Sequence, residues 1–157
     1  MGVHPGIAEV DVAREPPSCF TSGEQPIGKR QLGETPYVVT LQDDLGHTWT
    51  ADEPEELGGG NTASSPDRMI LASLGACTAI TIRMVATRRQ IPLTGVQVEL
   101  SLNPDGKPEA GTDIVRKVTL QGELDEDQRA QLLKIANLCP MHKLLTGEVR
   151  IQTELQA

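Results

Sequence analysis

The chain has 157 residues, 38% hydrophobic and 23% charged, which fits one globular domain with a core of its own. Its net charge of −8 argues against nucleic acid and against an anionic membrane surface as partners, since both favour a basic protein face. One Trp, one Tyr and one Phe leave an aliphatic core.

Three cysteines, Cys19, Cys77 and Cys139, do not make the disulfide framework of a small secreted protein. The first residues have neither the basic region nor the apolar block of a signal peptide, so we expect a cytoplasmic protein. Residues 1–25 are rich in Pro and Gly and are expected to form a tail, ordered at most in part. Residues 26–157 are expected to form a single domain.

A hairpin is predicted first. Residues 36–41 and 47–52 read as strands on either side of QDDLG, which has the acids and the glycine of a turn. A glycine-containing loop then leads to Ser65-Pro66-Asp67, a helix start with Ser65 as the cap.

The helix that follows is predicted to run some two dozen residues, to about Gln90. Its apolar stretch, residues 69–86, has the length of a membrane span but contains polar residues and Arg83, so we interpret it as buried in protein. Because it is apolar on most of its circumference, one small domain cannot surround it. A second subunit is the simplest cover.

Two alternating strands are predicted next, at 96–102 and 114–122. Asp125 with Gln128 forms a capping-box pattern that opens a helix reaching Cys139. Residues 149–155 alternate again and are predicted to form a closing strand. The predicted order is β-β-α-β-β-α-β, an α+β domain.

Cys139 directly precedes Pro140, which disfavours helical geometry at the cysteine and fits the first position of a new turn. Cys139 is then the N-cap of a short helix, where backbone N–H groups stabilise a thiolate. His142 and Lys143 are expected to add positive charge. Cys77 lies among small residues that leave room around its sulfur, and the two thiols form a pair if their helices touch.

Simpler interpretations remain open. A cysteine in an apolar helix is most often a small buried hydrophobe, and the Gly and Ala beside Cys77 allow close helix packing. A third interpretation is a metal site that uses Cys77, Cys139 and His142, although no second close pair of ligands is present.

Two segments, ADEPEELGGGNTASSPDRMILASLGACTAITIRM (51–84) and DEDQRAQLLKIANLCPMHKLL (125–145), resemble the OsmC/Ohr proteins of osmotic induction and organic hydroperoxide resistance. The resemblance covers roughly residues 36–155 and fits a less characterised OsmC-like branch. It implies antiparallel sheets wrapped around two central cysteine-bearing helices in an intertwined homodimer. It implies no metal, flavin or haem cofactor.

The resemblance also implies a thiol peroxidase cycle, in which Cys77 is the peroxidatic thiolate and Cys139 resolves its sulfenic acid as a disulfide. An external dithiol then restores both thiols. Asp67 stands where the family's peroxidases carry a glutamate. Arg30 is the expected arginine partner of the thiolate, with Arg68 or Arg83 as substitutes. The stretch after Cys139 also departs from the more polar one of those peroxidases.

Met69, Leu74, Met141 and His142 are expected to line an apolar pocket around Cys77 that favours organic hydroperoxides over hydrogen peroxide. The alternative function is a non-enzymatic protein that binds a hydrophobic ligand at the dimer interface or senses redox state.

Overall fold

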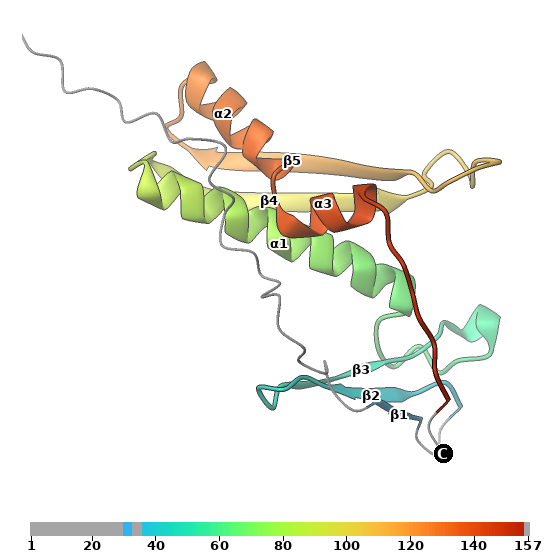
Figure 1. The fold of residues 1–157 in the computed structure, drawn as a ribbon. Coiled ribbons are helices and arrows are strands. Elements are labelled where there is room, and N and C mark those ends of the chain that lie inside the picture. Colours follow the sequence, from blue (N-terminus) through green and yellow to red (C-terminus); the bar gives the residue numbers. More distant parts are fainter. Residues whose placement is uncertain (1–29, 33–35, 156–157) are drawn as a thin grey trace, which may run out of the picture.

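The computed structural model describes residues 30–32 and 36–155. The predictions for residues 1–25 and for Cys19 fall outside this part of the chain. Within it, a small antiparallel sheet comes first, followed by a long helix, a two-stranded hairpin and two shorter helices (Figure 1). The α+β class predicted from the sequence is confirmed.

The first sheet has the order β1-β2-β3, with β1 (Arg30–Leu32), β2 (Val39–Gln42) and β3 (Thr48–Ala51) all antiparallel. The predicted hairpin is present with shorter strands. Its turn is held by Asp43, whose Oδ1 accepts from the N–H groups of Leu45 at 2.9 Å and His47 at 2.8 Å. A short 3-10 helix, η1 (Glu55–Leu57), lies in the loop that follows.

The long helix α1 (Pro66–Arg88) has 23 residues and confirms the predicted length and the proline at its first turn. Ser65 is the N-cap residue of α1, as predicted, but its side chain makes no capping hydrogen bond. Its hydroxyl donates to the Asp67 carboxylate instead of accepting from the helix backbone, because the acid two residues on is the stronger acceptor. The helix ends before Gln90, which has a left-handed φ of 55°.

Strands β4 (Leu93–Leu102) and β5 (Ile114–Gly122) form the predicted antiparallel hairpin, and their side chains alternate between half-buried and exposed. Helix α2 (Glu126–Ala136) has the predicted capping box of Asp125 and Gln128. The buried core lies where α2, the start of β4 and the last turns of α1 meet; it contains Ile82, Ala86, Leu93, Leu132, Ile135 and Ala136.

Two predictions from the sequence are wrong. Helix α2 ends at Ala136 and does not reach Cys139, because Pro140 holds Cys139 in extended geometry with φ −64° and ψ 141°. Residues 149–155 pair with no strand in the described part of the chain, and Ile151 is 85% exposed. In Figure 1 this segment runs as an irregular chain from α3 (Pro140–Thr146) toward the first sheet, and it forms no strand.

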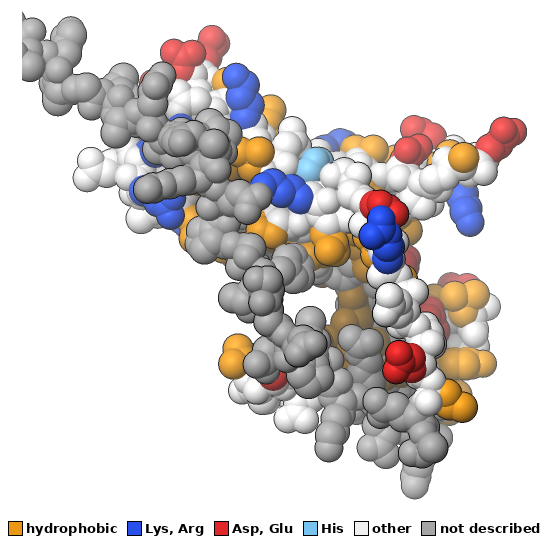
Figure 2. Space-filling model, in the orientation of Figure 1, with side chains coloured by type: hydrophobic (Ala, Val, Ile, Leu, Met, Phe, Trp, Pro, Cys, Tyr) orange, Lys and Arg blue, Asp and Glu red, His pale blue; other side chains and the backbone are white. Residues whose placement is uncertain are grey.

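One side of α1 is left uncovered by the rest of the described residues. Ile70, Ile80 and Met84 are exposed on it, Ile80 to 56%. By length and composition alone, α1 is the one helix in the described residues that has the properties of a membrane span. Only 33% of its most apolar stretch of 18 residues is buried. Figure 2 shows hydrophobic side chains along the middle of the molecule, whereas charged ones gather near α2 and at the hairpin tip.

Candidate functional site

Cys139 is the N-cap residue of α3, as predicted, and its side chain is fully buried, at 0% exposure. The backbone N–H of His142 donates to its Sγ at 3.3 Å. Pro140 sets this geometry, because the residue before a proline avoids helical geometry and the proline itself fits the first turn. The sulfur therefore faces a backbone donor at the positive end of a helix.

Thr78 of α1 lies directly against this sulfur. Its Oγ1 is 3.6 Å from Cys139 Sγ and 2.7 Å from the carbonyl oxygen of Leu74, to which it donates. Thr78 is fully buried and follows Cys77 in the chain. The fold thus brings Cys139 into contact with the residue next to Cys77, although 62 residues separate the two cysteines.

Arg116 of β5 completes this arrangement. Its Nη1 donates to Thr78 Oγ1 at 2.9 Å, and its Nη2 donates to Asn137 Oδ1 at 2.7 Å. Analysis of the sequence missed Arg116. The signal was present, because strand alternation places it on the inward face with Ile114 and Val118, where a lone arginine is unusual.

His142 does not supply the positive charge expected of it. Burial, and then the charge of Arg116, hold its pKa below the ordinary value of 6.5, so the imidazole is neutral at pH 7. Among the described residues, the cation that contacts this part of the site is therefore Arg116, which the fold supplies from a strand rather than from the turn after Cys139.

Cys77 lies on α1 and is half-buried. Adjacent residues of a helix point about 100° apart, so its side chain points away from the buried side on which Thr78 lies and shares the uncovered side with Ile70 and Met84, each seven residues away. Neither Cys77 nor Cys139 is in a disulfide. A Cβ on neighbouring Gly75 would lie 2.9 Å from Leu100 Cδ1, so this glycine permits close packing of α1 on β4.

Asp67 and Arg83, which were also predicted for the thiolate site, make their hydrogen bonds apart from this cluster. The Asp67 carboxylate accepts from the Ser65 hydroxyl and from the backbone of the first turn of α1, and these bonds hold its pKa below 3.8. Arg83 donates to the carbonyl oxygens of Leu93 at 2.6 Å and Thr94 at 2.9 Å. Arg30 lies in β1, and its side chain is outside the described part of the structure.

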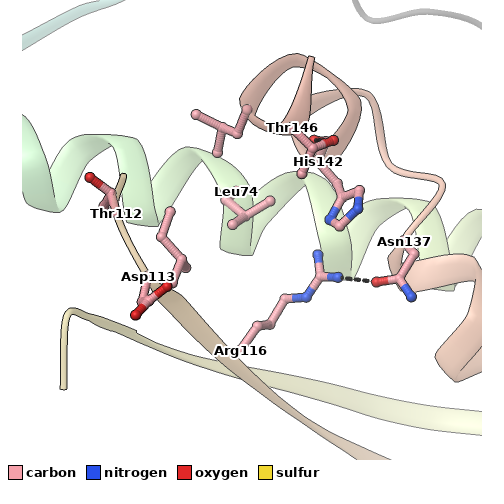
Figure 3. Close-up of a pocket in the computed structure, with 9 residues that line it drawn as sticks. Leu74, Thr112, Asp113, Arg116, Asn137, His142 and Thr146 are labelled. Atoms are coloured by element: carbon pink, nitrogen blue, oxygen red, sulfur yellow. Dashed lines mark hydrogen bonds between the residues drawn. The ribbon is translucent and has the colours of Figure 1, made fainter. Parts of the chain in front are cut away.

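A cavity of about 490 Å³ opens beside the cluster, between α1, β5 and α3 (Figure 3). Two of the residues predicted to line a pocket, Leu74 and His142, do line this cavity; Met69 and Met141 are half-buried and are not among its lining residues. The cysteines are not among them either. The lining consists of Leu74, Thr112, Asp113, Ile114, Arg116, Asn137, His142, Leu145 and Thr146.

The interpretation as a metal site finds no support in the geometry. In the part of the chain that the structure describes, no three His, Cys, Asp or Glu side chains are grouped so that they could hold a metal ion. A zinc site needs three or four converging ligands.

Comparison with known proteins agrees with the resemblance seen in the sequence. No curated protein sequence matches the chain. Among solved structures, an OsmC-like protein from Mycoplasma pneumoniae has a TM-score of 0.66 at 18% identity and covers 81% of this chain and 90% of its own. Organic hydroperoxide resistance protein OsmC of Legionella pneumophila has a TM-score of 0.59 at 25% identity, covering 82% and 93%.

An organic hydroperoxide resistance protein from Elizabethkingia anophelis has a TM-score of 0.58 at 19% identity and covers 81% of this chain and 92% of its own. The family model described as OsmC-like protein matches residues 58–154, which include Cys77 and Cys139. The family includes cysteine-based peroxide reductases. The chain therefore belongs to the OsmC-like protein family.

Proposed function

We propose that this protein is a thiol-dependent peroxidase that reduces organic hydroperoxides through Cys77 and Cys139. The observation that carries the proposal is the contact of 3.6 Å between Cys139 Sγ and Thr78 Oγ1. It brings one thiol against the residue that follows the other in the chain, which supports a reaction between the two cysteines. Cys77 is half-buried in the single chain, whereas Cys139 is fully buried, which suits a thiol that reacts only within the protein.

The proposed cycle starts at Cys77. Its thiolate attacks the terminal oxygen of the hydroperoxide, the O–O bond breaks, and the alkoxide takes up a proton to leave as an alcohol. Cys77 is then a sulfenic acid. The thiolate of Cys139 attacks the Cys77 sulfur, hydroxide leaves and is protonated to water, and a disulfide joins the two residues. An external dithiol reduces it by exchange and becomes oxidised itself.

The site has residues for the resolving step. The His142 N–H that donates to Cys139 Sγ stabilises negative charge on that sulfur, and the charge of Arg116 reaches it through the Thr78 hydroxyl. Asp67 and Arg30 remain the proposed partners of the Cys77 thiolate. Asp67 stands where the family's peroxidases carry a glutamate, which supports its assignment, and it has one methylene less reach than a glutamate.

The active form in this proposal is a homodimer. The exposed Ile70, Ile80 and Met84 make one apolar side of α1, which a second copy of the chain would cover. The unpaired alternating segment 149–155 would likewise gain a strand partner from a second copy.

The test follows loss of cumene hydroperoxide in the presence of dithiothreitol. Wild type should turn over, Cys77→Ser should not, and Cys139→Ser should consume about one equivalent and then stop unless dithiothreitol itself reduces the sulfenic acid. Cys19→Ser is the matched control and should behave as wild type. Peptide mass mapping of oxidised wild type should find the 77–139 disulfide. Turnover that survives in Cys77→Ser would contradict the proposal.

The second candidate is a non-enzymatic protein that holds a hydrophobic ligand at the dimer interface. The uncovered apolar side of α1 favours it. Peroxide left untouched by reduced wild type, together with an apolar molecule that co-purifies with the dimer, would select this function instead.

A further inference from the structure

The cavity beside α3 has two chemically different ends. In Figure 3, Arg116, His142 and Asn137 lie at one end, Thr112 and Asp113 at the other, and Leu74 between them. Ile114 and Leu145 add apolar surface. The volume of about 490 Å³ lies within the range of roughly 300–1,000 Å³ that is usual for small-ligand sites.

Among the described residues, no carboxylate neutralises the charge at the first end. Arg116 donates to a hydroxyl oxygen and an amide oxygen, both neutral, and within the described residues it makes no ion pair with a carboxylate. A half-buried guanidinium that has only neutral partners attracts an anion strongly. The planar guanidinium matches a carboxylate better than it matches a single oxygen.

The neighbouring groups set the orientation of such a ligand. His142 is neutral, since burial and Arg116 lower its pKa, so it can offer an N–H donor without adding a second fixed charge. Asp113 repels an anion from the opposite end. The apolar residues between the two ends accept a hydrocarbon body, so the cavity suits a molecule with one anionic end.

We propose that this cavity binds a small carboxylate with an apolar body, the carboxylate on Arg116 and the body along Leu74, Ile114 and Leu145. Neither cysteine lines the cavity, so the site is separate from the point where a hydroperoxide would meet Cys77. The proposal does not depend on peroxidase activity. Binding can be measured without peroxide.

The test titrates sodium octanoate, 1-octanol and octylammonium chloride into the full-length wild-type protein and follows backbone amide signals by NMR. Octanoate should shift signals of residues that line the cavity and bind about tenfold more tightly than 1-octanol, since a charge-assisted pair is added. Octylammonium should bind no better than the alcohol. Equal affinities for octanoate and 1-octanol, or shifts confined to the exposed side of α1, would overturn the proposal.

Two matched variants locate the carboxylate. Arg116→Gln should weaken octanoate about tenfold and leave 1-octanol unchanged. Arg129→Gln should leave both unchanged, because Arg129 donates to the carbonyl oxygens of Leu120 and Gly122, outside the cavity. Equal octanoate affinity in the two variants would refute the role of Arg116.

A measurement on wild type gives an independent test that does not require a variant to fold. Bound octanoate places a negative charge beside His142, so it should raise the pKa of that imidazole, read from its ring proton shifts. 1-Octanol should not raise it. A His142 titration that octanoate at saturation leaves unchanged would overturn the proposed placement of the carboxylate.

Discussion

Thr78 Oγ1 lies 3.6 Å from Cys139 Sγ and accepts a hydrogen bond from Arg116 Nη1 at 2.9 Å. A hydroxyl has one proton, and Thr78 gives it to the Leu74 carbonyl oxygen at 2.7 Å. In this state a protonated Cys139 is the donor to Thr78. When Cys139 ionises, the Thr78 hydroxyl can turn to the sulfur, because Arg116 makes it a better donor. Thr78 therefore links the charge on β5 to the buried thiol.

Thr78→Val should lower the free energy of unfolding by about 1–3 kcal/mol. Valine keeps the side-chain volume, but the groups that bond to the Thr78 hydroxyl are left without this partner in a buried place. Urea unfolding at one fixed protein concentration measures this. In the peroxidase assay, the same variant should accumulate Cys77 sulfenic acid, since the resolving thiol is no longer polarised.

Thr81→Val is the matched control for this variant. Thr81 is also a buried threonine of α1 and also donates to the carbonyl oxygen four residues earlier, that of Cys77, at 2.7 Å. It differs in that, within the described residues, its hydroxyl bonds to no sulfur and no guanidinium. The substitution should therefore lower the free energy of unfolding by no more than about 0.5 kcal/mol. Equal effects of the two substitutions would show that only the helix back-bond matters.

The sequence predicted local features well and tertiary contacts poorly, for a physical reason. Pro140 fixes the geometry of Cys139 through its immediate neighbour, so the N-cap could be predicted. The contact of Thr78 with Arg116 joins residues 38 apart and depends on how α1 packs on the hairpin. Alternation indicates the face of Arg116 but not its partner.

The closing strand predicted at 149–155 illustrates the same limit. Alternation reports which side chains share a face, whereas a strand also needs a neighbour for its backbone groups, and the described part of one chain offers none. The prediction that α2 reaches Cys139 is wrong for a different reason. The apolar pattern continues to Leu138, but the proline constraint on Cys139 outweighs it.

Asp52 should anchor the glycine-containing loop in a pH-dependent manner. Its buried carboxylate accepts from the Thr62 N–H at 3.0 Å, the Thr62 hydroxyl at 2.7 Å, and the N–H groups of Glu53 at 2.8 Å and Gly60 at 3.2 Å. The bonds from Thr62, first that of its backbone, lower the pKa of Asp52 from 3.8 to about 2. The carboxylate thus binds its proton less tightly in the folded state.

Because the folded pKa is the lower one, this stabilisation is complete above about pH 4 and is lost as the pH falls toward 2. Asp52→Asn should remove this stabilisation at neutral pH, so the free energy of unfolding should fall less steeply as the pH is lowered from about 4 to about 2. The backbone amides of Gly60 and Thr62 should also exchange faster. The exposed Asp44→Asn is the control and should change neither. Unaltered exchange at both amides would contradict the prediction.

Gly122→Ala should destabilise the protein more than Gly111→Ala. Both glycines have a positive φ, 130° and 83°, so both pay the strain of a left-handed alanine, roughly 1 kcal/mol or more. At Gly122 a Cβ would also lie 2.2 Å from the Pro92 carbonyl oxygen, whereas at Gly111 it meets nothing within 4 Å. Thermal unfolding of the two variants measures the difference, and a lower Tm for Gly111→Ala would refute the packing argument.

Ile80→Asp should convert the proposed dimer into monomers. Ile80 is 56% exposed on the uncovered side of α1, and an aspartate buried there by a second copy would face hydrocarbon without a partner, at a cost of several kcal/mol. Light scattering at micromolar concentration should give the dimer mass for wild type and the monomer mass for the variant. Leu45→Asp, which alters a 79% exposed turn residue, is the control and should remain dimeric. If wild type itself is a monomer, the apolar side of α1 must have another cover, and the intertwined assembly is excluded.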